Sequence, residues 1–409
     1  MHLVLKTSNK QGLAFFEVVS IAFYFLVEIN VELFVHRPVF IAAVVMVFFS
    51  FGLSRGIVIK NTKYRTWVIV WALITAVSLI YSIRPSYTFT ALLTILARGF
   101  VLFLLICRIE TKEQLVYLLK IYIAVTSINL VYILSKVDVM SLGVERIGVR
   151  TIESDVSWNS NSIGMVLALA VSSIFVLQRK KQFVGFHRVI SFALVLVFIF
   201  ITLLTGSRIA LIMMLLIPLS IYFLSSTLRN IWYKVIIILI SLYLAYYLIM
   251  NVPQIYDVLG SRIERLILSL QGKNVIDGSI SSRRELIKDG IEWFRSKPLL
   301  GYGMYTFMVL SKQFFAYEWY AHNNYIEILV GTGILGLVGY YWYYIYMLCY
   351  SISQKLQSRK IIVSLIIVSL ICDFAVVSFK DFVFQFLIAL ATIVMNLDMM
   401  NKDKEEVIV

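Results

Sequence analysis

The sequence contains very little charge for its length. Only 15% of its 409 residues are charged, whereas 60% are hydrophobic and the mean hydropathy is +0.88. A soluble domain of this size could not cover its surface with so few polar groups. Apolar runs of about 18 residues or more, the length that crosses a bilayer, recur along the whole chain. We therefore expect an all-α, polytopic membrane protein built as a bundle of helices.

Other features are scarce or missing. The three cysteines, Cys107, Cys349 and Cys372, lie within or at the ends of apolar runs, so we expect no structural disulfide. No cluster of carboxylates has the spacing of metal ligands, so we predict no metal and no cofactor. The first apolar stretch lacks the small-residue cleavage site of a signal peptide, so we expect a retained helix. No internal repeat of the kind found in many transporters is evident.

Twelve apolar runs predict about twelve membrane-spanning helices. The seventh and eighth are joined by a very tight turn at Thr205-Gly206-Ser207, and the last two by a turn around Lys380-Asp381. The expected spans are residues 13–31, 38–54, 66–83, 87–107, 115–135, 160–177, 188–205, 207–224, 231–250, 323–349, 360–379 and 382–398.

Basic residues are distributed unevenly among the predicted loops. With the N-terminus inside, residues 55–65, 179–188 and 355–360 place most of the loop lysines and arginines on the cytoplasmic side. This asymmetry follows the positive-inside rule and puts both termini in the cytoplasm. We accordingly expect four parts: residues 1–250 with spans one to nine, 251–322 as an extracytoplasmic loop, 323–398 with spans ten to twelve, and 399–409 as a cytoplasmic tail.

The long external loop has the sequence features of a helix. Residues 282–285 (Ser-Arg-Arg-Glu) fit a capping box, which satisfies free N–H groups at a helix start, and Pro298 would end the helix. This pattern predicts an amphipathic helix that packs as a cap on the outer mouth of the bundle. Its apolar stripe would be Leu286, Ile287, Ile291 and Phe294.

A histidine precedes the tenth predicted span. His322 would lie at the outer membrane interface, where the start of a helix disfavours the imidazolium and holds the ring neutral. A neutral imidazole is what a general base requires. The alternative is an interfacial histidine that only caps the helix, but Asn323 and Asn324 can already serve as caps.

Glycines follow this histidine at short intervals. Gly333, Gly336 and Gly339 recur every three residues. This spacing is typical of helices that pack closely against a neighbour. Such packing would also hold the helix behind His322 rigidly, as a catalytic base requires.

Several arginines lie where an anion could bind them. Arg208 opens the eighth predicted span, where free helix N–H groups suit a phosphate; the alternative is an arginine that reaches the interface. Arg283 and Arg284 open the external helix, and could equally be a solvated helix start. Arg98 lies midway along the fourth span, where it could bind a ligand or pair with an acid such as Asp373. Further candidates for substrate contacts are Asn323, Arg98 and Arg150.

These residues form a recognisable pattern. His322 and Asn323 are followed, after nine residues, by Gly333 and Gly336 in a Gly-x-x-Gly. The segments "TGSRIAL" and "SSRRELIKDGIEWFRSKPLLGYGMYTF", and more weakly "WNSNSIG", complete it. In these features the sequence resembles the O-antigen ligase and polymerase superfamily of bacterial surface-polysaccharide enzymes. Leu337 departs from the residue that usually follows the last glycine of the ligases, which favours a polymerase.

The resemblance implies a metal-independent, inverting glycosyltransferase in a bacterial cytoplasmic membrane, with its active site facing outside. Its donor would be an undecaprenyl-diphosphate-linked oligosaccharide. Arg208 and Arg283, with Arg284 beside them, would hold the diphosphate, and His322 would deprotonate the acceptor hydroxyl. A flippase and a chain-length regulator are the protein partners that the resemblance implies, and nucleic acid is not among the expected partners.

Three activities remain open at this point. A polymerase would use a second lipid-linked repeat unit as acceptor, to build an O-antigen, capsule or exopolysaccharide. A ligase would use a different acceptor such as lipid A-core. A transporter of the lipid-linked oligosaccharide would bind the same diphosphate with the same arginines, but without chemistry.

Overall fold

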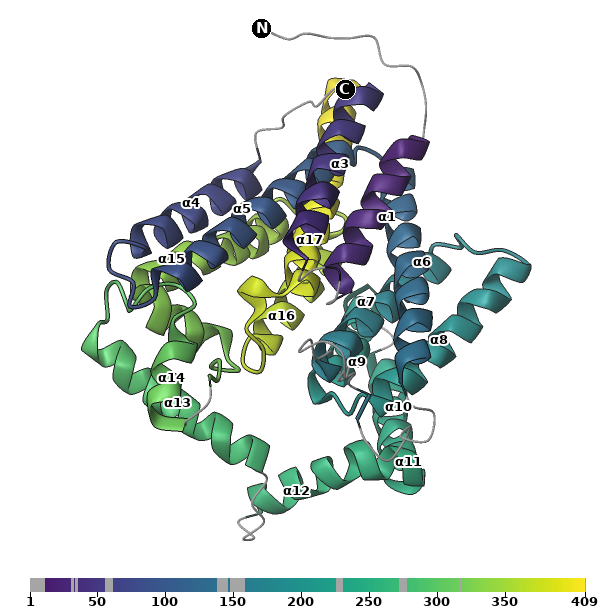
Figure 1. Cartoon of the computed structure of the whole chain (residues 1–409). Coiled ribbons are helices and arrows are strands. Elements are labelled where there is room, and N and C mark those ends of the chain that lie inside the picture. Colours follow the sequence, from purple (N-terminus) through teal and green to yellow (C-terminus); the bar gives the residue numbers. More distant parts are fainter. Residues whose placement is uncertain are drawn as a thin grey trace, which may run out of the picture.

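The computed structural model of the chain describes residues 12–30, 33, 36–55, 62–137, 146–147, 159–225, 231–271, 278–315 and 318–408. Every regular element in these ranges is a helix (Figure 1). The helices are α1 (Phe15–Ile29), α3 (Arg37–Arg55), α4 (Lys63–Ser78), α5 (Pro85–Arg108), α6 (Lys112–Lys136), α7 (Ser160–Arg179), α8 (Phe186–Leu204), α9 (Arg208–Ser225), α10 (Ile231–Asn251), α11 (Pro253–Ile255), α12 (Ser261–Leu270), α13 (Gly278–Ser296), α14 (Phe307–Phe315), α15 (Asn324–Ser353), α16 (Arg359–Cys372) and α17 (Phe382–Ile408). Short helical turns lie at Tyr256–Gly260 and Ser378–Lys380.

A helix occupies each of the twelve predicted spans. Seven of the described helices are long and apolar enough to cross a membrane, namely α3, α5, α6, α7, α8, α15 and α17. The all-helical, multi-pass architecture is thereby supported, while the count of twelve and the external position of the long loop stay predictions.

Two predicted helix ends are wrong because contacts distant in sequence end the helices earlier. Helix α4 stops at Ser78 instead of residue 83, and beyond it the Ile83 N–H donates to the Tyr302 carbonyl (3.0 Å). Helix α16 stops at Cys372 instead of residue 379, and the next carbonyl, that of Asp373, accepts from the N–H at the start of α15 (2.7 Å).

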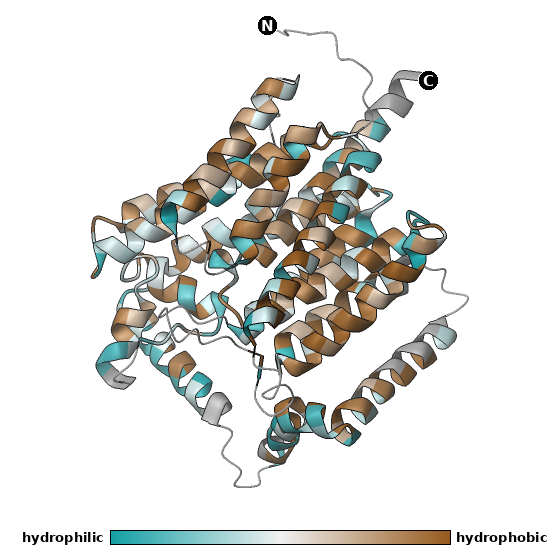
Figure 2. Cartoon of the chain, turned by 45° about the vertical axis from the view of Figure 1, so that its right-hand side comes forward, coloured by the Kyte–Doolittle hydropathy of each residue, from teal (hydrophilic) through white to brown (hydrophobic). Residues whose placement is uncertain are grey.

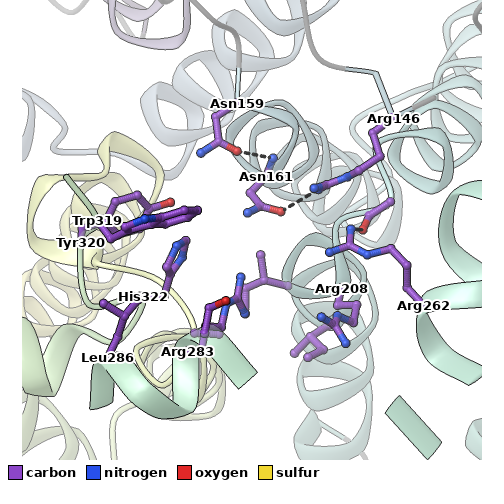
Figure 3. Close-up of a pocket in the computed structure, with 15 residues that line it drawn as sticks. Arg146, Asn159, Asn161, Arg208, Arg262, Arg283, Leu286, Trp319, Tyr320 and His322 are labelled. Atoms are coloured by element: carbon purple, nitrogen blue, oxygen red, sulfur yellow. Dashed lines mark hydrogen bonds between the residues drawn. The ribbon is translucent and has the colours of Figure 1, made fainter. Parts of the chain in front are cut away.

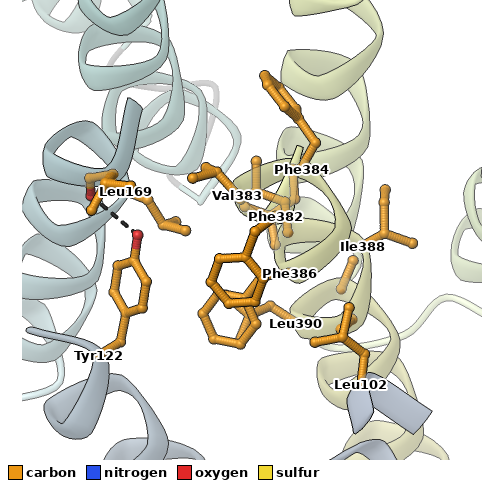
Figure 4. Packing of buried hydrophobic residues seen from close by; sticks show 14 of the residues in the cluster. Leu102, Tyr122, Leu169, Phe382, Val383, Phe384, Phe386, Ile388 and Leu390 are labelled. Atoms are coloured by element: carbon orange, nitrogen blue, oxygen red, sulfur yellow. Dashed lines mark hydrogen bonds between the residues drawn. The ribbon is translucent and has the colours of Figure 1, made fainter. Parts of the chain in front are cut away.

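Helix α17 lies in the centre of the molecule and most of its apolar residues are buried (Figures 1 and 4). The ring of Phe386 packs on Phe25 of α1 and Tyr122 of α6, with centroids 4.9 and 5.3 Å apart. The Tyr122 hydroxyl also donates to the Val166 carbonyl of α7 (3.2 Å). Aromatic packing therefore gathers α1, α6 and α7 around the central helix.

Two buried ion pairs join α1 to α5. Glu17 accepts two hydrogen bonds from Arg108 (2.5 and 2.7 Å), and Glu28 accepts two from Arg98 (2.8 and 2.6 Å). Charges in an apolar bundle are tolerated when they are paired in this way. The expectation that Asp373 could be the acidic partner of Arg98 is therefore wrong, because the nearer carboxylate on α1 takes that place.

The outer surface of several helices is apolar. Large exposed apolar side chains include Val189, Leu196 and Phe200 on α8 and Trp232 and Leu239 on α10. In Figure 2 the helices of the bundle are mostly brown, whereas α12 and α13, at its lower end, carry more hydrophilic residues. An apolar surface of this extent fits contact with lipid, while the more polar helices gather at one end of the bundle.

Helix α13 begins one turn earlier than its capping box predicts. It starts at Gly278, so Ser282 lies inside it, since glycine and serine are only weak obstacles to a helix that packs well. It ends at Ser296, as Pro298 predicts. The buried face also differs from the predicted stripe: Leu286 is buried, but Ile291 is 38% exposed. The buried cluster against α14 and α15 consists of Leu286, Phe307, Leu310, Ala321, Ile326 and Val330.

The glycines of α15 do not all serve helix packing. Gly333 has φ +65° and ψ −161°, a left-handed conformation that kinks the helix. A Cβ at Gly333 would collide with the backbone of Leu299. At the kink the Tyr302 N–H donates to the Val330 carbonyl (2.9 Å) and the Ile334 N–H donates to the Pro298 carbonyl (2.9 Å). The kink thus admits residues 298–303 against the helix, and the packing role fits only Gly339, which lies against α4.

Candidate active site

A cavity of about 640 Å³ lies at the end of the bundle where the polar helices gather (Figure 3). It is formed between α7, α9, α12, α13 and the segment that precedes α15. Its walls combine guanidinium groups, amide and hydroxyl side chains, and aromatic rings. The lining residues are Arg146, Asn159, Asn161, Gly206, Arg208, Ile209, Ile212, Arg262, Ser282, Arg283, Leu286, Trp319, Tyr320, His322 and Ala375.

The tight turn between α8 and α9 positions two of the arginines. Gly206 takes φ +60°, which allows the turn, and a side chain there would meet the Val258 carbonyl. Arg146 Nε donates to the Thr205 carbonyl (2.8 Å), and Arg262 Nη1 donates to the Gly206 carbonyl (3.0 Å). Two successive carbonyls therefore hold two guanidinium groups from distant segments at one edge of the cavity.

Arg208 is the first residue of α9 and faces the same cavity. The Ser207 hydroxyl accepts from the Ala210 N–H (3.3 Å), as a capping serine does. The remaining N–H groups of the first turn and the helix dipole favour an anion at this end.

Arg283 reaches the cavity from the opposite side. It lies on α13, one turn from the cluster that anchors this helix to α15, and Figure 3 shows it between His322 and Arg208. Its neighbour Arg284 is exposed and does not line the cavity, because consecutive residues of a helix point in different directions.

The cavity has a strongly positive character. None of the described residues that line it is acidic, while four are arginines. The pKa of Arg146 is lowered to about 10, chiefly by burial and then by the nearby charges of Arg262, Arg208 and Arg283. Guanidinium groups that repel one another in this way are neutralised when a phosphate or diphosphate binds among them.

His322 occupies the aromatic side of the cavity. Its φ of +50° is a left-handed conformation that a side-chain-bearing residue rarely adopts, and such conformations concentrate at functional sites. Its ring lies 4.0 Å from that of Tyr320, centroid to centroid. The pKa of His322 is lowered to about 3, chiefly by burial and then by the charges of Arg283 and Lys380. The His322 ring is therefore neutral, as the sequence predicts, but the main cause is burial of the side chain and not the start of the helix.

The start of α15 is fixed by its own amide groups. Asn323 is the N-cap, and its side chain accepts from the Ile326 N–H (3.1 Å). Asn324 donates to the Tyr341 hydroxyl (2.8 Å), which in turn donates to Asp373 (2.6 Å). These buried bonds set the position from which the preceding histidine enters the cavity.

The segment that carries most of this site matches a known family. Residues 193–341 match the O-antigen ligase family. The match runs from α8 into α15 and contains Arg208, Arg262, Arg283 and His322. It confirms the resemblance found in the sequence and supports an O-antigen ligase- or polymerase-type membrane function. The search of curated proteins gives no match.

Not all of the predicted site residues lie in this cavity. Arg208, Arg283 and His322 are brought together there. Arg284 is exposed outside it, Asn323 is occupied as a helix cap, and Arg98 is bound to a carboxylate elsewhere in the bundle. Arg150 lies outside the described residues.

Two cavity arginines were missed by the sequence reading. Arg262 stands in a hydrophilic loop with many charges and no motif of its own, and Arg146 stands four residues before the predicted Arg150. The two were detectable only as members of basic clusters, because the carbonyl groups that select them belong to a turn about sixty residues away in each case.

Proposed function

We propose that this protein is a membrane glycosyltransferase that polymerises undecaprenyl-diphosphate-linked oligosaccharide repeat units at the outer face of a bacterial cytoplasmic membrane. The observation that carries the proposal is the cavity in which four arginines face one neutral histidine. The histidine and three of these arginines lie in the segment that matches the O-antigen ligase family. The neighbouring apolar helices would hold the lipid tail in the bilayer, so the donor reaches the cavity by lateral diffusion.

The arginines would bind the donor diphosphate. Guanidinium forks donate two parallel hydrogen bonds to phosphate oxygens, and Arg208 adds the positive end of helix α9. When the bond between the anomeric carbon and the diphosphate oxygen breaks, negative charge grows on the leaving group. Fixed cations aimed at that charge stabilise the transition state, which is the largest single contribution in many enzymes.

His322 would activate the acceptor. A neutral ring nitrogen removes the proton of an acceptor hydroxyl, whose oxygen forms a bond to the anomeric carbon as the diphosphate departs from the opposite face. The configuration is therefore inverted. The low pKa of His322 makes it a weak base as long as no anion offsets the charge of Arg283. A diphosphate beside Arg283 would offset the positive charge and raise this pKa toward the range in which general bases work.

A ligase is the second candidate, and one observation favours it. The matching family is described as O-antigen ligase. Leu337, which stands where ligases usually have glycine, threonine or tyrosine, favours the polymerase. The two activities use the same donor chemistry and differ in the acceptor, so an acceptor-dependence assay separates them.

The test uses purified protein in detergent with a lipid-linked repeat unit as both donor and acceptor. We expect a ladder of polymers on a gel, lost in His322→Ala and Arg283→Gln. Arg284→Gln, one residue along the same helix but outside the cavity, is the matched control and should retain the ladder. A ladder that survives His322→Ala would refute the role of the histidine. If wild-type protein yields product only after lipid A-core is added, the protein is a ligase.

A further inference from the structure

We propose that Lys380 is a positioning residue that holds His322 in its working orientation, through Tyr320 on one side and Glu327 on the other. The assignment rests on the proposed function for its kinetic consequence. Lys380 lies in the short helical turn between α16 and α17, outside the matched family segment and almost sixty residues after the histidine.

The backbone of His322 needs such support. A residue with a side chain at φ +50° is less stable there than in the extended or right-handed helical regions. The conformation persists only when neighbouring contacts enforce it. No hydrogen bond links the His322 ring to the described residues, so its orientation depends on the ring of Tyr320, on the more distant ring of Trp319 and on the backbone before it.

Lys380 stacks on the ring that contacts the histidine. Its Nζ lies 4.3 Å from the ring centroid of Tyr320 and 4.7 Å from that of Tyr305, and it donates to the Tyr305 hydroxyl (3.3 Å). Both distances are within the range of cation–π attraction, which strengthens when the groups are shielded from water. The ammonium group therefore pins the Tyr320 ring, whose centroid is 4.0 Å from that of His322.

Glu327 fixes Ala321, the residue between Tyr320 and His322. Its Oε2 accepts from the Ala321 N–H (2.8 Å), and the side chain is buried in the first turn of α15. Its Oε1 is buried without a hydrogen-bond partner among the described residues, and the neighbouring positive charge of Lys380 compensates it. Of the two residues directly before the histidine, Tyr320 is thus contacted by Lys380 itself, and Ala321 is held by a carboxylate that the charge of Lys380 stabilises.

The backbone of Lys380 is itself held by contacts with α5 and α15. Its carbonyl accepts from Arg98 Nη1 (2.7 Å), and Arg98 is held by Glu28 of α1. The Phe379 N–H donates to the side chain of Asn324 at the start of α15 (3.1 Å). A buried chain of contacts therefore connects the centre of the bundle to the histidine, which gives Arg98 a supporting role in place of a substrate contact.

Kinetics with the lipid-linked repeat unit test the assignment. Lys380→Met should lower kcat by about 10- to 100-fold, the effect of misplacing a reacting group, and leave the donor KM within about twofold. Lys380→Arg keeps a stacking cation and should recover most of kcat. The matched control is Lys312→Met, which removes a 60% exposed lysine on α14. A loss in KM alone, or an unchanged kcat in Lys380→Met, would overturn the proposal.

A spectroscopic measurement makes the test independent of activity. The chain's three other histidines are replaced by asparagine, so that the NMR signal of the imidazole of His322 stands alone. The ring current of Tyr320 shifts this signal; Lys380→Met should move it and Lys380→Arg should not. An unmoved signal in Lys380→Met would overturn the proposal. If the signal moves while wild-type protein makes no glycan product, the proposed function fails and the positioning role stands.

The assignment is testable even if Lys380→Met does not fold. In that case the same signal is compared between Tyr320→Leu and Tyr320→Phe. Loss of the ring in Tyr320→Leu should move the His322 resonance, whereas Tyr320→Phe keeps the stacked ring and the signal. Equal spectra for the two variants would overturn the proposal, because the ring would then not contact the histidine.

Discussion

Replacing Gly333 by alanine should destabilise the protein through the kink in α15. The conformation at Gly333, φ +65° and ψ −161°, belongs to a region that only glycine occupies readily, and an added Cβ would also collide with the backbone of Leu299. Strain of this kind costs about 1–3 kcal/mol for the backbone alone. A shift of Leu299 would also disturb the hydrogen bond that its neighbour Pro298 accepts from the Ile334 N–H. We therefore expect a loss of at least about 2 kcal/mol, or about 30-fold in the folding equilibrium.

The measurement is unfolding of the detergent-solubilised protein followed by tryptophan fluorescence. Gly52→Ala is the control, since Gly52 lies in α3 with open space around the position of a Cβ. Alanine is the better helix former by up to about 1 kcal/mol, so Gly52→Ala should be neutral or stabilising. If Gly333→Ala proves as stable as Gly52→Ala, then α15 runs straight in the folded protein and the reasoning is refuted.

Three further outcomes are expected. Arg98→Leu leaves Glu28 as an unpaired buried charge and should lower the free energy of unfolding by about 3–5 kcal/mol in a denaturation series. The double variant, with leucine at Arg98 and at Glu28, should regain much of this stability. Losses that simply add in the double variant would contradict the pairing. Arg262→Gln should weaken the binding of inorganic pyrophosphate about tenfold, as measured by calorimetry, since a hydrogen bond to a charged group is worth about 1.5–3 kcal/mol. The control is Arg265→Gln, on the exposed side of α12, which should leave the affinity unchanged. The pKa of His322 falls from 6.5 to about 3 on folding, so between these pH values the unfolded chain binds more protons than the folded one, and acid lowers stability. From pH 8 to pH 5 the free energy of unfolding of wild-type protein should fall by about 2 kcal/mol more than that of His322→Gln. Equal losses in the two proteins would show that the ring is exposed to water.

The sequence predicts the positions of the helices better than their ends. Apolar runs place a helix at each expected span because hydropathy and length are local properties. The ends of α4 and α16 are set by Ile83 meeting Tyr302 and by Asp373 meeting the start of α15, and such contacts leave no local signal. The kink at Gly333 was not predicted for a related reason, since glycines at intervals of three fit close packing of a straight helix as well as they fit a kink.

The site was predictable where a residue stands beside a local motif. His322 precedes two asparagines, residues that favour helix starts, Arg208 follows a Gly-Ser turn, and Arg283 lies in a conspicuous polar helix. Arg146 and Arg262 lack such neighbours, and they enter the cavity only because two carbonyl groups of the turn before α9 bind them. Their recruitment depends on tertiary structure.

The crowding of four arginines in one cavity has a thermodynamic consequence. Folding brings together guanidinium charges that the unfolded chain keeps apart, so the ligand-free fold carries a repulsion that an anion removes. Any ligand that binds only the folded state stabilises it, by about 2.7 kcal/mol at a concentration of 100 times Kd. Folding and anion binding are therefore linked equilibria, and if the proposed lipid-linked donor is the substrate, a membrane rich in that donor is also the one in which this chain unfolds least.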